Sequence, residues 1–481
     1  MDKQQYFIDI HCHLFTAADI PLYQLAKRLH RKAQHPLRLF MAPAAIALLS
    51  VKKFREFIQF FESEPKQNVL RVTGQLKDSL EQLGVEAERV IMTPLIMDFD
   101  AGGKVDKLLP QVERLVAASK YAEGVTILPF VGIDPRRLLT TGSMASAGSD
   151  GDQRAVSPAT VRKRWKEFLD VNLVKGIGAR GGWGQLGKKI RSGHLVGVKL
   201  YPPLGFDVLP QQDLRLRDCH LEIYRELAHR KLPVTVHCQE NSFELASSHQ
   251  VAMDFTKPGN WRQVLEFSSQ LSQLRLNFGH FGGDIGTKMV VPMRNRGEME
   301  DFEDWVAPKK PRAKGWTYEI VAMLKQYPNT YADISAFAFQ DKVAAAALMW
   351  LLAFDENGFF DQDGASNYKL QDKLMWGSDY PMILPNFPNY HSYLRAFRQT
   401  IRQNQRRFAS FEMPPQWREP DAVRVGGPSP SGQSEVALGV RNHAAGRRRK
   451  GRNKQSWQPL PSAAELFQKL TCENPRRFLF E

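Results

Sequence analysis

Residues 7–15 read Phe-Ile-Asp-Ile-His-Cys-His-Leu-Phe, a short apolar run that ends in two histidines one residue apart. In an extended strand alternate side chains point to the same face, so His11 and His13 converge while Cys12 points away. Two convergent imidazoles suit a borderline divalent metal such as zinc, which needs at least one more protein ligand. Two unrelated polar residues after a strand would look the same, so the remaining ligands must come from elsewhere in the chain.

Seven further strand-like runs follow the first one. They lie at residues 89–95, 125–131, 196–201, 233–237, 275–280, 330–335 and 373–379. Helical segments lie between strands along the chain, and this alternation is typical of a parallel β/α architecture. Eight such units close a ring. We therefore expect an α/β fold, a (β/α)8 TIM-type barrel with helical insertions and a disordered basic insertion before the last helix.

A single domain is predicted for residues 1–481, because the chain returns to the barrel after its longest insertion. Ser462 and Glu465 have the spacing of a capping box ahead of an apolar helical run. Residues 462–481 are therefore expected to form a closing helix. A helical insertion is expected at about residues 21–83, between the first and second strands.

Nearly half of the formal net charge of +15 lies in one short run. Seven lysines and arginines, and no acid, lie between Arg441 and Gln455. This run belongs to a low-complexity stretch, about residues 412–460, that has too few aromatic and branched side chains to order itself. We interpret it as a disordered, solvated insertion and expect no nucleic-acid partner. The alternative is a non-enzymatic role in which this run binds RNA, anionic lipid or an acidic protein.

The remaining composition indicates a soluble cytoplasmic protein. No apolar stretch approaches the roughly 20 residues that cross a bilayer, and the first strand leaves no room for a signal peptide. The four cysteines form no Cys-x-x-Cys pair and are too few for a disulfide framework. We expect a small-molecule substrate, and the sequence leaves the oligomeric state open between a monomer and a homo-oligomer.

Polar side chains end several strands of the predicted barrel. His11 and His13 end the first strand, Lys199 lies near the end of the fourth, and His237, His280 and Asp379 end the fifth, sixth and eighth. Barrels of this type carry their chemistry at the carboxyl ends of the strands. Because the eighth strand pairs with the first in a closed ring, we expect Asp379 beside His11 and His13. Four histidines and an aspartate at one mouth predict a metal site.

These motifs together resemble the amidohydrolase superfamily, specifically the amidohydrolase-related (amidohydrolase 2) branch of TIM-barrel metal-dependent hydrolases. The motifs that carry the resemblance lie at residues 9–13, 199–202, 236–238, 279–280, 376–381 and 474–478. The resemblance implies one zinc or similar ion held by His11, His13, His237 and Asp379. It also implies that His280 lies close to the metal-bound water or the substrate.

Lys199 decides the subtype that the resemblance implies. In binuclear members of the superfamily a lysine at this strand end is carbamylated and bridges two metals, so a second metal stays open. In many members of the branch a similar lysine serves a single-metal site, which we favour. An uncarbamylated Lys199 would be a cation directed at the pocket and suited to a substrate carboxylate.

Two reactions remain open on such a centre. The first is hydrolysis of a C–N or C–O bond, in an amide, lactone or ester of a small carboxylate-bearing molecule, by a metal-activated water. The second is non-oxidative decarboxylation or hydration of a small aromatic or unsaturated acid, because the branch also contains decarboxylases of the aminocarboxymuconate-semialdehyde type. In the hydrolytic reaction Asp379 would carry the proton from the water to the leaving group, and His280 would position the water or stabilise an oxyanion.

Overall fold

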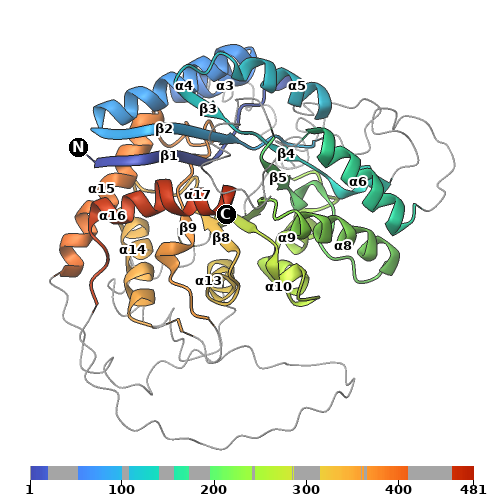
Figure 1. Cartoon of the computed structure of the whole chain (residues 1–481). Coiled ribbons are helices and arrows are strands. Elements are labelled where there is room, and N and C mark those ends of the chain that lie inside the picture. Colours follow the sequence, from blue (N-terminus) through green and yellow to red (C-terminus); the bar gives the residue numbers. More distant parts are fainter. Residues whose placement is uncertain are drawn as a thin grey trace, which may run out of the picture.

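The computed structural model describes residues 2–19, 52–99, 108–139, 156–172, 195–240, 244–283, 285, 315–358, 360–361, 366–409 and 458–481. The first part of the predicted helical insertion and nearly all of the predicted basic insertion lie outside these residues. Within them the chain alternates strands with helices, and every predicted strand range overlaps a strand of the structure. Figure 1 shows the strands at the centre of the molecule with the helices packed around them.

The paired strands of the described residues are all parallel and form two sheets. The first sheet has the order β1 (Asp2–Cys12), β2 (Val85–Pro94), β3 (Val125–Ile127). The second runs β4 (Phe130–Gly132), β5 (Gly197–Leu200), β6 (Val234–Gln239), β7 (Leu276–Gly282), β8 (Thr330–Asp333), β9 (Leu374–Met375). Because the strands are parallel, their carboxyl ends lie at the same edge of each sheet. The predicted site residues lie at this edge.

The third predicted strand, residues 125–131, is split into β3 and β4. The split falls at Pro129, which has no backbone N–H to donate to a neighbouring strand. A parallel bridge between Leu95 and Phe130 joins the two sheets across this break, and the Ile96 nitrogen donates to the Phe130 oxygen at 2.9 Å. The two sheets therefore continue into each other.

The other ends of the two sheets also meet. The backbone nitrogen of Ile10 donates to the Trp376 oxygen at 3.4 Å, that of Asp379 to the His11 oxygen at 2.6 Å, and that of His13 to the Tyr380 oxygen at 2.7 Å. The segment after β9 thus lies beside β1. The arrangement is consistent with a TIM-type barrel, although the strand pairing itself does not close into one ring.

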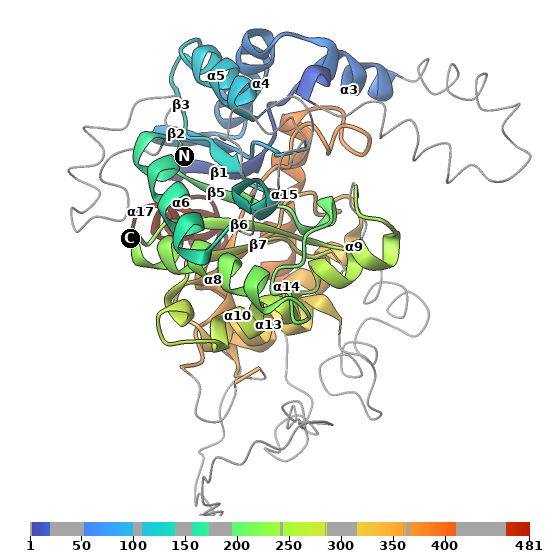
Figure 2. The same cartoon turned by 90° about the vertical axis from the view of Figure 1, so that its right-hand side faces the viewer.

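The helices surround these strands, as Figures 1 and 2 show. The first are α3 (Lys52–Glu62), α4 (Pro65–Gln82), α5 (Leu108–Ser119), α6 (Pro158–Asn172), α8 (Leu214–His229) and α9 (His249–Thr256). They are followed by α10 (Pro258–Glu266), α13 (Trp316–Gln326), α14 (Lys342–Glu356) and α15 (Tyr390–Ala409). Figure 2 shows α3, α4 and α5 above the first sheet, with α8, α10 and α13 on the opposite side. No helix in the described residues is long and apolar enough to cross a membrane.

The closing segment starts with the predicted capping box. The Ser462 side chain accepts from the Glu465 nitrogen, and the Glu465 carboxylate accepts from the Ser462 nitrogen. Residues 463–480 are helical throughout, as α16 (Ala463–Gln468), a π-helical turn at Lys469–Glu473 and α17 (Asn474–Phe480) in succession. The Trp376 nitrogen donates to the Leu470 oxygen at 2.8 Å, so this segment packs directly on β9.

Candidate metal centre

Two compact groups of buried ligand atoms share His11. The first consists of His11, His13 and Asp379, and the second of His11, His280 and Asp333; within each group the ligand atoms lie within 4.8 Å of one another. His11 and Asp333 have no exposed surface, and the other three residues are at most 8% exposed. Both groups therefore lie in a low-dielectric environment, where charges interact strongly.

The Nδ1 atoms of His11 and His13 are already bound to oxygen acceptors. His11 Nδ1 lies 3.0 and 3.1 Å from the carboxylate oxygens of Asp333, and His13 Nδ1 lies 3.0 Å from the Leu95 carbonyl oxygen. An oxygen acceptor assigns the imidazole proton to Nδ1, so Nε2 of each neutral ring carries the lone pair. Both Nε2 atoms are therefore available as metal ligands.

Both lone pairs face the same carboxylate oxygen. Oδ1 of Asp379 lies 3.2 Å from Nε2 of His13 and 3.5 Å from Nε2 of His11. Burial lowers the pKa of His13, although Asp379 opposes this effect. Burial alone would raise the pKa of Asp379, but His13, His280 and His11 together hold it below its ordinary value. An ionised carboxylate facing two lone pairs needs a cation between them, so these residues fit a divalent metal.

His237 and Lys199 are buried at the same end of the strands but belong to neither compact group. Nε2 of His237 and Nζ of Lys199 have no hydrogen-bond partner among the described residues. The His237 ring lies 4.8 Å from the His280 ring and 4.5 Å from the Tyr201 ring. The structure thus brings together three of the four predicted metal ligands, and the role of His237 stays a prediction.

The environment of Lys199 and His237 disfavours positive charge. Burial lowers the pKa of Lys199 to about 8, with Asp333 and Asp379 opposing the shift. Burial, His280 and Lys199 lower the pKa of His237 well below its ordinary value. His237 is therefore neutral at neutral pH, as a metal-ligating imidazole has to be.

Asp333 makes more hydrogen bonds within the site than the sequence indicated. Its carboxylate accepts hydrogen bonds from His11 Nδ1, from Asn277 Nδ2 at 2.7 Å and from the His280 backbone nitrogen at 3.1 Å. Burial would raise the pKa of Asp333, but His11, His280 and a hydrogen bond from Ser335 outweigh it and hold the pKa below its ordinary range. The sequence signal that could have found this role is the position of Asp333 at the end of a strand beside His280.

His280 is oriented by Ser335. The Ser335 hydroxyl donates to Asp333 Oδ1 and lies 2.9 Å from Nδ1 of His280, so it can accept the Nδ1 proton and leave the lone pair on Nε2. Burial lowers the pKa of His280 to about 4, with Asp379 opposing and His11 reinforcing the shift. At neutral pH His280 is therefore a neutral base.

The backbone at two of these residues is in the left-handed region. His280 has φ of 64° and Asp379 has φ of 56°, values that non-glycine residues rarely adopt. Such conformations cluster at functional sites, where the surrounding structure holds them. β9 is correspondingly short and ends at Met375, so Asp379 lies in the segment after the strand, whereas the sequence predicted it at the strand end.

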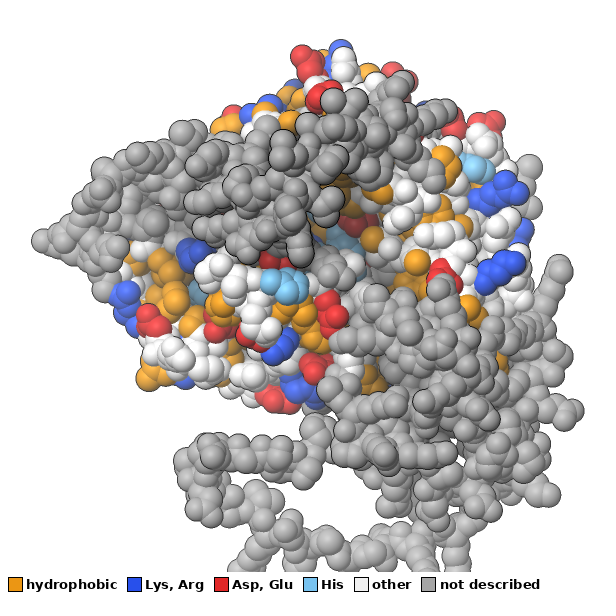
Figure 3. Space-filling view, turned by 180° about the vertical axis from the view of Figure 1, so that it is seen from behind, with side chains coloured by type: hydrophobic (Ala, Val, Ile, Leu, Met, Phe, Trp, Pro, Cys, Tyr) orange, Lys and Arg blue, Asp and Glu red, His pale blue; other side chains and the backbone are white. Residues whose placement is uncertain are grey.

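Apolar and aromatic side chains lie next to the histidines. Phe15, Met97, Tyr201 and Leu204 form a small buried cluster, separate from the main core. The Phe15 ring lies 5.2 Å from the His13 ring. In Figure 3 histidine and acidic side chains lie among hydrophobic ones on one face, and the described Lys and Arg side chains are interspersed with acids instead of forming one basic patch.

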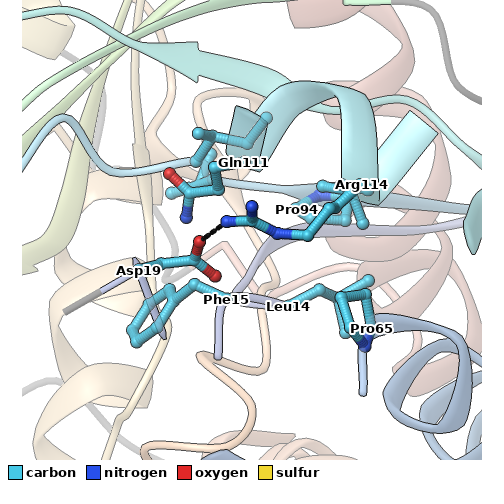
Figure 4. A pocket seen from close by; sticks show the side chains of 10 residues that line it. Leu14, Phe15, Asp19, Pro65, Pro94, Gln111 and Arg114 are labelled. Atoms are coloured by element: carbon cyan, nitrogen blue, oxygen red, sulfur yellow. Dashed lines mark hydrogen bonds and ion pairs between the residues drawn. The ribbon is translucent and has the colours of Figure 1, made fainter. Parts of the chain in front are cut away.

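A small pocket of about 10 Å³ adjoins the same segment. It is lined by Leu14, Phe15, Leu95 and Gln111, among others, and Asp19 and Arg114 pair within it (Figure 4). Asp19 Oδ2 also accepts from the backbone nitrogen and the hydroxyl of Thr16. The ion pair thus ties the chain that leaves His13 to helix α5.

A comparison with protein families gives one match. A family model described as Amidohydrolase matches residues 184–419, a range that includes Lys199, His237, His280 and Asp379. No curated protein matches the chain.

Two solved structures are similar at low identity. IDCase from Metarhizium anisopliae in apo form is 12% identical, with 69% of this chain and 72% of that chain covered and a TM-score of 0.31. Amidohydrolase 2 from Bifidobacterium longum subsp. infantis is 11% identical, with 83% and 92% covered and a TM-score of 0.33. These scores are too low to carry an argument, so the assignment relies on the family model. The predicted resemblance to the amidohydrolase family is confirmed over residues 184–419, about half of the chain.

Proposed function

We propose that the chain is a single-domain (β/α)8 barrel enzyme whose divalent metal is held by His11, His13 and Asp379, with His237 as the fourth ligand. The observation that carries this proposal is the position of Asp379 Oδ1, which faces the Nε2 atoms of His11 and His13. His237 supports it because its Nε2 is buried without a partner among the described residues. Zinc is the metal we favour, since neutral imidazoles and a carboxylate are its preferred ligands.

The proposed reaction is hydrolysis of a C–N or C–O bond, in an amide, lactone or ester. The metal would supply Lewis-acid polarisation of a carbonyl and would lower the pKa of water. Asp379, whose carboxylate is ionised, would take a proton from the attacking water and deliver it to the leaving group. His280 is a neutral base oriented by Ser335 and would position that water or donate to the developing oxyanion once protonated.

Lys199 would select the substrate. Its ammonium is buried, and no hydrogen bond within the described residues satisfies it. A substrate carboxylate would provide the missing charge-assisted hydrogen bonds. We therefore propose a small carboxylate-bearing substrate for a cytoplasmic enzyme, in line with four buried cysteines that form no disulfide.

A second candidate is non-oxidative decarboxylation or hydration of an aromatic or unsaturated acid. The apolar cluster of Phe15, Met97, Tyr201 and Leu204 favours it, because the cluster lies against His13 and His237. A flat, apolar substrate body fits such surroundings better than a polyhydroxylated one does. The two candidates differ in product: carbon dioxide, or a hydrated acid, in place of a hydrolysed bond.

The test begins with the metal content of the purified protein in buffer with bicarbonate. We expect about one zinc per chain, retained in Lys199→Ala and in the exposed-histidine control His249→Ala and lost in His11→Ala. Two metals per chain, one of them lost in Lys199→Ala, would indicate a carbamylated lysine and a binuclear hydrolase. No metal in wild-type protein after reconstitution with zinc would refute the proposal.

Once loaded, the enzyme is offered panels of carboxylate-bearing amides, lactones and esters and of unsaturated acids. Hydrolysed products support the first candidate, and carbon dioxide or a hydrated acid supports the second. In either case His280→Asn should lower the rate. Turnover that persists in His11→Ala would show that this centre does not carry the reaction.

A further inference from the structure

Helix α15 presents two fully buried tyrosines to the candidate metal centre. Tyr390 and Tyr393 are three residues apart, so they share one face of the helix. The ring of Trp376, just after β9, lies 6.0 Å from both tyrosine rings. The tyrosine hydroxyls are therefore directed from one rigid element toward the strands that carry the metal ligands.

Tyr390 reaches the first strand and the segment after the last one through Asp9. Its hydroxyl donates to Asp9 Oδ2 at 2.9 Å. The same carboxylate accepts from the Ser378 hydroxyl at 2.6 Å, from the Ser378 nitrogen at 2.9 Å and from the His11 nitrogen at 3.2 Å. Asp9 thus joins the backbone of His11 to the residue that precedes Asp379, and Tyr390 holds Asp9 in place.

Tyr393 reaches the end of β8. Its hydroxyl accepts from the Phe337 nitrogen at 3.1 Å and lies 3.3 Å from the Ile334 carbonyl oxygen, to which it donates. Ile334 lies between Asp333, which binds His11 Nδ1, and Ser335, which orients His280. Tyr393 therefore holds the backbone of the segment that orients both histidines.

We propose that Tyr390 and Tyr393 are positioning residues of the metal centre, which set the distance between Asp379 and Asp333 on the two sides of His11. This inference depends on the proposed function, because it assigns what the two hydroxyls do for metal binding. Neither tyrosine would be a metal ligand. Each acts through a backbone segment that a metal ligand or its hydrogen-bond partner shares.

The test compares three Tyr→Phe variants, each of which removes one buried hydroxyl and leaves the ring. Tyr390→Phe and Tyr393→Phe are the test variants, and Tyr224→Phe on α8 is the control. Tyr224 is also fully buried, and its hydroxyl donates to the Val208 carbonyl oxygen at 2.9 Å. Zinc affinity is measured by competition with a chromophoric chelator, and the unfolding temperature of each metal-free variant is recorded beside it.

We expect zinc affinity to fall about tenfold in Tyr390→Phe and in Tyr393→Phe, at the lower end of the range for groups that orient metal ligands. Affinity in Tyr224→Phe should stay within about twofold of wild type at a similar change in unfolding temperature. Equal affinities in all three variants would overturn the inference and leave the proposed function intact. A wild-type chain that binds no zinc would overturn both.

Discussion

Gly377 packs directly against His11: a Cβ atom on Gly377 would lie 2.6 Å from the His11 Cβ and 3.1 Å from the His11 nitrogen. Real Cβ atoms do not approach a neighbour so closely. The neighbour here is part of strand β1, and moving this strand would disrupt its hydrogen bonds and packing. We predict that Gly377→Ala destabilises the protein by about 1–3 kcal/mol, the usual cost of overpacking, and weakens zinc binding.

Urea unfolding and zinc titration measure the two effects. Gly74→Ala in α4 is the matched control, because nothing lies within 4 Å of a Cβ at that position. Alanine in the middle of a helix should stabilise the protein by about 0.5–1 kcal/mol. A Gly377→Ala variant that is as stable as wild type and binds zinc normally would show that β1 can move away from the segment after β9.

Asp333→Asn should weaken the metal centre. An asparagine amide cannot accept hydrogen bonds from His11, Asn277 and His280 as the carboxylate does, so His11 loses the partner that fixes its proton on Nδ1. We expect zinc affinity and turnover to fall by about 10–100-fold. In the control Asp341→Asn, at the N-cap of α14, both should stay unchanged because Asn caps helices as well as Asp does.

Lys199→Met should separate substrate binding from metal binding. If Lys199 pairs with a substrate carboxylate, its removal should lower kcat/KM for acids by about 10–100-fold, the equivalent of one charged hydrogen bond. Zinc content should not change, and the unfolding temperature should rise because a buried, unpaired ammonium is lost. Lys373→Met is the control, since burial lowers the pKa of Lys373 to about 8 as well. A kcat/KM that falls equally in both variants would contradict the assignment.

The metal-free chain should lose stability in mild acid. Burial lowers the pKa of His280 from 6.5 to about 4 and also lowers those of His13 and His237. Between about pH 6.5 and 4 the unfolded chain therefore binds protons that the folded chain does not, so stability falls as pH falls. His280 alone would account for a loss of about 3 kcal/mol in the free energy of unfolding.

Asp9 acts in the opposite sense over part of this range. Burial raises the pKa of Asp9 to about 6, so the folded chain keeps this carboxyl protonated where the unfolded chain has lost the proton. The stability that this gives is lost as pH rises through about 6. One such group does not cancel three histidines. Urea unfolding at pH 6.5 and 4.5 in the presence of a chelator measures the net slope, which should be smaller in His280→Asn. Stability that is unchanged or higher at pH 4.5 would contradict this account.

The sequence indicated which residues lie at the site better than it indicated the contacts between them. The alternation in residues 7–15 placed His11 and His13 on one side, and the order of strands placed Asp379 beside them, because both follow from backbone geometry. The strand-end position of Asp333 beside His280 could be recognised from the sequence, but its hydrogen bond to His11 depends on the side-chain direction of His11. The backbone turn that carries Asp379 beyond a two-residue strand likewise depends on tertiary contacts with β1.

The boundaries of elements were predicted less well, for local reasons. Pro129 divides a strand that its apolar composition had indicated as continuous, because it lacks a donor. The closing segment carries the predicted cap at Ser462 but contains a π-helical turn, whose carbonyl at Leu470 accepts from Trp376. No local sequence pattern predicts such a contact between residues far apart in the chain.

The junction of β1 with the segment after β9 also governs when the candidate centre can be assembled. During synthesis His11 and His13 leave the ribosome first, and for most of the translation time they have no carboxylate opposite them. Asp379 arrives with the last quarter of the chain, and the α16–α17 segment that packs on β9 arrives later still. Under the proposed function, metal loading would therefore follow the synthesis of Asp379, and a chain that stops before Asp379 would lack one member of the group formed with His11 and His13.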